Sequence, residues 1–145
     1  MSRLRQSGDS VQVERVVAEI LRRAGATVEE YGDPKEHGVD FAVWSDALQR
    51  SLGNPILIEV RASQLNEKSF QHAYSRLTRQ VQESGSAAGL LLYLERTGKR
   101  FEKPEAWVPS VLWFDVEDFA KRLSEKSFAE VLVERRNRTV HGLTD

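Results

Sequence analysis

Apolar residues first form a regular pattern between positions 11 and 24, where they recur at steps of three and four. This spacing places side chains on one face of an α-helix, so we predict a helix over residues 11–24, with Ser10 as its N-cap and Gly25 as its stop. The polar residues 1–10 are expected to be a flexible N-terminus. The apolar stripe of this helix consists of Val13, Val16, Val17, Ile20, Leu21 and Ala24.

Three short strands are expected next, because short apolar runs are bounded there by turn-forming residues. They cover residues 26–31, 39–44 and 56–60. The second strand alternates, with Asp40 on the opposite face from Val39, Phe41 and Val43. The third strand is apolar until Glu59 and gives the strongest strand signal in the chain.

The second half of the chain alternates between helices and strands. A long helix begins at Asn66 or Ser69, and Gly85 and Gly89 bracket the turn that follows it. Its apolar stripe consists of Phe70, Ala73, Tyr74, Leu77 and Val81. The remaining elements are strands at 90–94 and 111–114, a helix from the cap Asp115 to Leu123, and a last helix at 128–140 before Gly142.

This order of elements predicts an α/β fold in which a mixed sheet of four or five strands is flanked by helices. The length of 145 residues suits one domain with one core. We expect that core to occupy residues 11–115 and the two C-terminal helices to form an appendage at 116–145. The alternative is a three-layer α/β sandwich with a parallel sheet.

Composition excludes several kinds of chemistry. Cysteine is absent, which excludes thiol catalysis, disulfides and cysteine-bearing zinc sites. No apolar run reaches the ~18 residues of a membrane span, and the N-terminus lacks the apolar core of a signal peptide, so we expect a cytoplasmic protein with no membrane partner.

The net charge of −1 conceals a basic block, because residues 61–103 carry eight basic and four acidic side chains. A nucleic-acid-binding surface is one interpretation of this block, and an ordinary solvated surface is the other. The candidate nucleic-acid-binding residues are Lys68, Arg76, Arg79, Lys99 and Arg100.

Asp40 and Glu59 are acids in strands that otherwise read as buried. Burying an unpaired charge costs several kcal/mol, so each acid lies at an exposed edge, pairs with a cation or binds a metal. If the two strands are neighbours, both carboxylates can point to one face, and Mg²⁺ is commonly held by one or two carboxylates. Glu59 could instead form a structural ion pair with Arg61, and Asp40 could simply end its strand.

Taken in order, these acids resemble the motif of the PD-(D/E)xK nuclease superfamily. The nearest members are the Mrr-like restriction endonucleases and the archaeal Holliday-junction resolvases. Glu14 resembles the metal-site glutamate of their opening helix, and Gln80 matches a glutamine that follows in Mrr-like proteins. The segments Gly38-Val39-Asp40 and Ile58-Glu59-Val60-Arg61 resemble their "G-x-D" and "(V/I)-E-x-K" motifs, within a similarity that covers residues 11–95.

The resemblance implies a restriction-endonuclease-like fold and a DNA nuclease of defence or repair, with a homodimer as one arrangement. It also implies that Asp40 and Glu59 hold Mg²⁺ or Mn²⁺, in a catalytic set of Glu14, Asp40, Glu59, Arg61 and Gln80. The sequence departs from the motif at Arg61, because arginine stays protonated and cannot act as the base.

Three interpretations of Arg61 follow. The chain is a weakened nuclease, a nuclease that takes a lysine from elsewhere, or a fold kept for binding after catalysis was lost. Lys68 and Lys35 are the substitute lysines nearest to the motif. A non-catalytic module that binds a protein or nucleic acid is therefore the main alternative function.

A second motif lies at the C-terminus, where Arg136 and His141 resemble the R-x4-H signature of HEPN-type ribonucleases. The resemblance implies metal-free RNA cleavage, in which histidine acts as acid or base and arginine holds the phosphate. Such domains need about four helices, and only two helices are predicted in this part of the chain. The simpler interpretation is a helix C-terminus, where basic side chains offset exposed carbonyls before Gly142.

Overall fold

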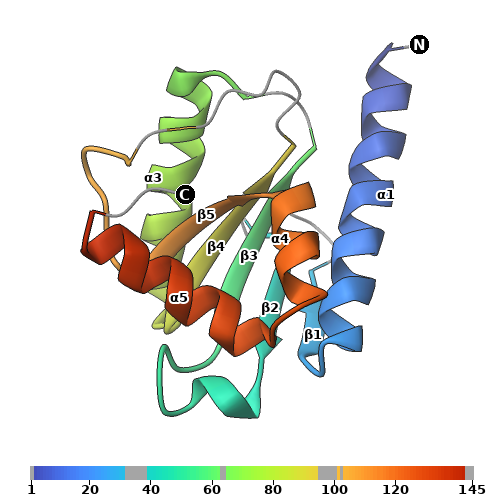
Figure 1. Cartoon of the computed structure of the whole chain (residues 1–145). Coiled ribbons are helices and arrows are strands. Elements are labelled where there is room, and N and C mark those ends of the chain that lie inside the picture. The colour runs from blue at the N-terminus through green and yellow to red at the C-terminus, as the bar shows by residue number, and fades with distance from the viewer. Residues whose placement is uncertain (1, 32–38, 63–64, 95–100, 102, 143–145) are drawn as a thin grey trace.

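The chain forms a five-stranded sheet with helices on both faces (Figure 1). The computed structural model describes residues 2–31, 39–62, 65–94, 101 and 103–142, and only the backbone of residues 2–11. The helices are α1 (Ser2–Arg23), the 3-10 helix η1 (Asp46–Leu48), α3 (Glu67–Ser84), α4 (Val116–Leu123) and α5 (Phe128–Val140). The strands are β1 (Thr27–Glu30), β2 (Phe41–Trp44), β3 (Ile56–Arg61), β4 (Ala88–Tyr93) and β5 (Val111–Asp115).

The strands are ordered β1-β2-β3-β4-β5 across the sheet. β1, β2 and β3 pair antiparallel, whereas β3, β4 and β5 pair parallel. The predicted mixed sheet with two C-terminal helices is therefore confirmed, and the alternative with a parallel sheet is wrong. A short connection suffices for the antiparallel pair β2–β3, while the parallel pair β3–β4 needs the crossover that α3 provides.

The two faces of the sheet carry separate buried clusters. Residues of α1, α4 and α5 pack on one face, and α3 packs on the other. Figure 1 shows α4 and α5 crossing in front of the sheet, with α1 alongside and α3 behind it. The apolar stripe predicted for α3 is the face that is buried. Among the described helices, none is both long and apolar enough to cross a membrane.

Three details differ from the predictions. α1 begins at Ser2 rather than near Val11, because the polar residues before Val11 continue the helix although Ser10 is a favourable N-cap. Val39 precedes β2 and packs in the cluster on the α3 side, whereas Phe41 and Val43 pack on the other side.

The third difference concerns Gly89, which lies inside β4 rather than in the turn before it. A Cβ at this position would come within 2.8 Å of Val81 Cγ2 and 3.1 Å of Leu77 Cγ. The missing side chain therefore allows α3 to pack closely against the sheet. This close approach helps to fix the position of α3, whose N-terminal half contributes to the site described next.

Candidate active site

Asp40 is held against β3 on both sides of Glu59. The backbone N–H of Asp40 donates to the carbonyl oxygen of Ile58 at 2.9 Å. The carboxylate Oδ2 of Asp40 accepts from the backbone N–H of Val60 at 2.7 Å. β2 and β3 are neighbours, as the sequence interpretation required, and they bring the two acids together. Both acids are buried, with 6% of Asp40 and 3% of Glu59 exposed.

The two carboxylate oxygens of Glu59 have different surroundings. Oε2 accepts from Arg76 Nη2 at 2.9 Å and from Arg61 Nη1 at 3.3 Å. Oε1 is buried and has no hydrogen-bond partner among the residues that the structure describes. Burial raises the pKa of Glu59, and the positive charges of Arg76 and Arg61 oppose this rise. In Glu59, Oε2 is thus paired with two arginines, whereas Oε1 is shielded from solvent without a hydrogen-bond donor among the described residues.

Glu14 joins this pair of acids from α1. Burial and a hydrogen bond to the Asp40 side chain raise the pKa of Glu14 to about 8. Burial also raises the pKa of Asp40, against the lowering effect of the bonds from Val60 and Glu14. At neutral pH Glu14 is therefore protonated, and its O–H donates a hydrogen bond to the Asp40 carboxylate. The structure brings together Glu14, Asp40, Glu59 and Arg61, as the motif requires.

The donor set fits a hard divalent cation. Within the described part of the chain, no group of three or more His, Cys, Asp or Glu side chains is arranged to hold a metal ion. Mg²⁺ does not need three, because it commonly takes one or two carboxylates and keeps several waters. The buried Oε1 of Glu59 lacks the partner that a buried carboxylate oxygen requires, and a cation would supply it. Asp40 and Glu59 are therefore the residues that would hold Mg²⁺ or Mn²⁺.

A basic pocket of about 300 Å³ lies beside Glu59, between β3 and the first half of α3. Arg61 and Arg76 contribute to it, together with Lys68 and His72. The sequence pattern identified Arg76 as a nucleic-acid-binding candidate and missed its bond to Glu59. These residues are 17 positions apart, and no local signal connects them.

Other predicted residues lie away from this pocket or outside the described residues. Arg79 and Gln80 follow Arg76 on α3 but are not among the residues that line the pocket. The loop residues Lys35, Gly38, Lys99 and Arg100 lie outside the described part of the chain.

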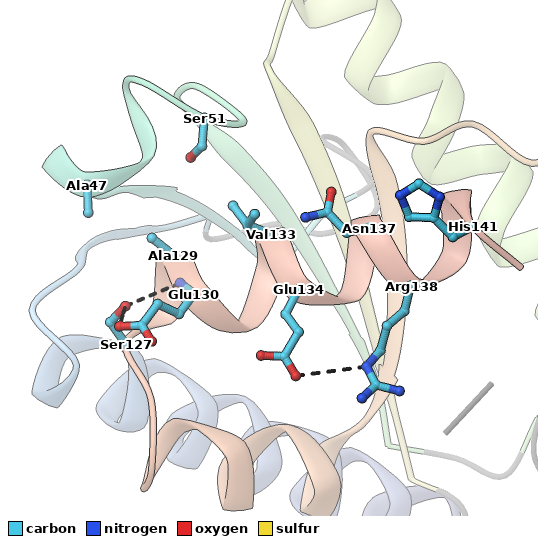
Figure 2. A pocket seen from close by; sticks show the side chains of 10 residues that line it. All are labelled: Ala47, Ser51, Ser127, Ala129, Glu130, Val133, Glu134, Asn137, Arg138 and His141. Carbon is cyan, nitrogen blue, oxygen red and sulfur yellow. Dashed lines mark hydrogen bonds and ion pairs between the residues drawn. The ribbon is translucent and has the colours of Figure 1, made fainter. Parts of the chain in front are cut away.

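A second groove, of about 650 Å³, lies on the α5 side of the sheet (Figure 2). Figure 2 shows Val133 and Asn137 of α5 on the side toward Ser51. Glu134 and Arg138 of the same helix form an ion pair with an N···O distance of 3.9 Å. His141 lines this groove, but Arg136 is not among its lining residues. The groove shares no residue with the acid cluster.

The HEPN-like alternative lacks the helical arrangement on which it depends. Of the described helices, α3 lies on the opposite face of the sheet from α1, α4 and α5, so these helices do not form a bundle. His141 is the C-cap of α5, and Gly142 follows with a positive φ of 72°. This geometry matches the simpler interpretation of the tail as a helix end.

A comparison with protein families matches the part of the chain that contains the acid cluster. The Mrr catalytic-domain family model, described as a restriction endonuclease, matches residues 6–103. This range includes Glu14, Asp40, Glu59 and Arg61 and extends beyond β4. A search of curated proteins finds no match.

Proposed function

The chain belongs to the Mrr-like restriction endonuclease family of the PD-(D/E)xK superfamily, and from this premise we propose that it is a metal-dependent nuclease that hydrolyses phosphodiester bonds in DNA. We also propose that it acts in defence against foreign DNA or in DNA repair. The observation that carries the proposal is the buried, unpartnered Oε1 of Glu59 beside Asp40. A carboxylate oxygen stripped of water without a donor is a costly feature unless a cation uses it.

Each residue of the cluster has a distinct role in this proposal. Asp40 and Glu59 would hold Mg²⁺ or Mn²⁺, which when bound stabilises charge on the phosphoryl oxygens and lowers the pKa of a bound water. The protonated Glu14 carboxyl donates a hydrogen bond to Asp40 and so fixes the orientation of that carboxylate. The Val60 N–H holds the same carboxylate from the β3 side.

Arg61 supplies positive charge but takes no proton. Its guanidinium is already bonded to Glu59 Oε2, and 32% of its side chain is exposed. A planar guanidinium can bind a phosphate with two parallel N–H bonds, which an ammonium group cannot do. Arg61 therefore replaces the base function of the family lysine with a phosphate-binding function.

A cleavage assay tests the proposal. Linear, supercoiled and branched DNA would be incubated with the wild type in Mg²⁺, in Mn²⁺ and in EDTA, alongside Asp40→Asn and Glu59→Gln. The exposed acids Asp46 and Glu117 provide matched controls as Asp46→Asn and Glu117→Gln. We expect cleavage only with metal, a loss of at least about 100-fold in the two site variants, and unchanged cleavage in the controls.

The result that would contradict the proposal combines an absence of cleavage with an absence of metal binding. If no form of DNA or RNA is cut and neither metal gives a binding heat, the nuclease proposal is wrong. The chain would then be a non-catalytic module built on the nuclease fold. Circular dichroism of each variant separates a loss of chemistry from a loss of folding.

A further inference from the structure

We propose that the basic pocket beside Glu59 is a dedicated subsite for a second phosphate of the nucleic-acid backbone, next to the phosphate that is cut. Arg61, Lys68, His72 and Arg76 line this pocket, together with Asn66 and Ser69. The inference depends on the proposed function only in taking nucleic acid as the ligand. It adds a binding site that extends beyond the acid cluster and the family motif, through Asn66, Lys68, Ser69 and His72.

The charge of the pocket favours a dianion or a diester phosphate. None of the described residues that line it is acidic, whereas two arginines and one lysine, all basic side chains, line it. The two arginines of the pocket both bond to Glu59, through a single carboxylate oxygen. One carboxylate cannot balance three cations, so the pocket keeps a net positive charge that a phosphate would offset.

The donors of the pocket remain sufficient after the bonds to Glu59 are counted. Arg76 uses Nη2 and Arg61 uses Nη1 for Glu59, and each guanidinium has five N–H donors in total. About half of the Arg76 side chain is exposed, and Lys68 and His72 are both exposed on α3. The site can therefore receive a phosphate without first breaking the ion pairs that hold Glu59.

The size and position of the pocket limit the ligand further. A volume of about 300 Å³ is at the lower end for ligand pockets, which suits a hydrated phosphate and its sugar linkage better than a larger ligand. The pocket opens at the N-terminal half of α3, where the helix dipole also favours an anion. Because Arg61 and Arg76 belong to both sites, a phosphate in the pocket lies directly beside the carboxylates that would hold the metal.

Lys68→Ala and His72→Ala test the subsite, because both residues line the pocket and the ion pairs with Glu59 are formed by Arg61 and Arg76 instead. The matched control is Lys121→Ala, which removes an exposed cation from α4 on the other face of the sheet. Binding of a fluorescent DNA duplex would be measured in EDTA between 50 and 200 mM salt, with Asp40→Asn as the background for every variant. Inorganic phosphate would be titrated into ¹⁵N-labelled protein of the same set.

We expect Lys68→Ala to weaken duplex binding by about threefold to tenfold and to reduce the salt slope by about 1, because one phosphate contact is lost. His72→Ala should weaken binding less, and Lys121→Ala should change neither quantity. Inorganic phosphate should shift the amide signals of residues 66–76, and Lys68→Ala should raise the phosphate concentration needed for these shifts.

Unchanged affinity, salt slope and phosphate shifts in Lys68→Ala and His72→Ala would overturn the subsite. This outcome is distinguishable from failure of the nuclease proposal, because no step of the binding assay requires cleavage or metal. If the wild type cuts DNA and Lys68→Ala binds it normally, the nuclease stands and the subsite is wrong. If nothing is cut but the binding differences appear, the subsite stands as part of a binding module.

Discussion

Arg76 Nη2 lies 2.9 Å from Glu59 Oε2, and this ion pair ties α3 to β3 at the centre of the candidate active site. The acid is buried, with 4% of its side chain exposed, whereas 48% of the Arg76 side chain is exposed. A buried acid that keeps its charge needs such a partner. The pair therefore links the packing of the helix to the charge of the acid that we propose as a metal ligand.

Removal of Arg76 should change the affinities for metal and for DNA in opposite directions. In Arg76→Ala, a cation beside Glu59 is lost, so a divalent cation meets less repulsion. We expect Mn²⁺ to bind about fivefold more tightly at pH 8.5 without DNA, which corresponds to about 1 kcal/mol for a partly exposed charge. DNA binding in EDTA should weaken in the same variant. Isothermal titration measures the first effect and fluorescence anisotropy the second.

Lys121→Ala is the control for both measurements, since this residue lies on the other face of the sheet. Weaker metal binding in Arg76→Ala at pH 8.5 would show that Arg76 serves mainly to keep Glu59 ionised. Equal and negligible heats in the wild type and in Arg76→Ala would mean that the two carboxylates form no metal site.

Glu14 should make the metal-free protein less stable as the pH rises. Its pKa is about 8 in the folded chain and 4.5 in the unfolded chain, so the folded state binds the extra proton between these values. The stabilisation from that proton is complete below pH 4.5 and is lost as the pH rises through 8. We expect the free energy of unfolding in EDTA to fall between pH 5.5 and pH 8.5, and to fall less steeply in Glu14→Gln.

Urea denaturation at pH 5.5, 7 and 8.5 checks this dependence. Glu19→Gln is a matched control on the same helix, since Glu19 is exposed and paired with Arg23. Identical slopes in the wild type and in Glu14→Gln would contradict the shared proton between Glu14 and Asp40. Saturating Mg²⁺ should remove part of the difference, because a cation stabilises the ionised carboxylates.

Gly89→Ala should destabilise the protein although it adds only one methyl group. The new Cβ would meet Val81 Cγ2 at 2.8 Å, and overpacking of this kind costs about 1–3 kcal/mol. Thermal denaturation of Gly89→Ala, Val81→Ala and the double variant forms a mutant cycle. The double variant should be more stable than the sum of the single losses predicts, by more than about 0.5 kcal/mol. Strict additivity would show that the contact is absent in solution.

Local patterns predicted the elements of the fold well. The apolar stripe of α3 needs only the helical period, and the Asp115 cap needs only a side chain that accepts from the N–H of Asp118. The predicted start of α1 was wrong, because a favourable N-cap residue such as Ser10 does not by itself prevent the helix from beginning earlier. Gly89 was misplaced because its role depends on Val81 and Leu77, which lie on another element.

The candidate site was only half predictable, for a related reason. Asp40 and Glu59 stood out because each is an acid in an apolar strand, and the neighbouring strands then brought them together. The bond of Arg76 to Glu59 depends on the rotation of α3 against the sheet, which no sequence spacing records. The pKa of Glu14 likewise depends on how deeply α1 buries it beside Asp40. The acids in the two strands could be recognised from the sequence, whereas the contacts that depend on how α1 and α3 pack against the sheet needed the structure.

Arg61→Lys tests the position where this chain departs from its family. A lysine there restores a group that can take a proton, but it loses the planar fork that binds phosphate through two donors. We expect metal-dependent cleavage to be retained with kcat equal to or above that of the wild type, and KM for DNA to rise. The pH profile of kcat should gain a rising limb in Arg61→Lys, because the lysine must lose its proton before it can act as a base.

Arg61→Ala completes the comparison, because it removes the charge without offering a base. We expect its kcat to fall by about tenfold to 100-fold, since general acid–base and charge-stabilising groups each contribute effects of this order or larger. A pH profile of Arg61→Lys that matches the wild type, with kcat as low as in Arg61→Ala, would show that the arginine fork itself is required for catalysis. A lysine at position 61 would then be as disruptive as alanine, and the phosphate-binding role of Arg61 would account for both losses.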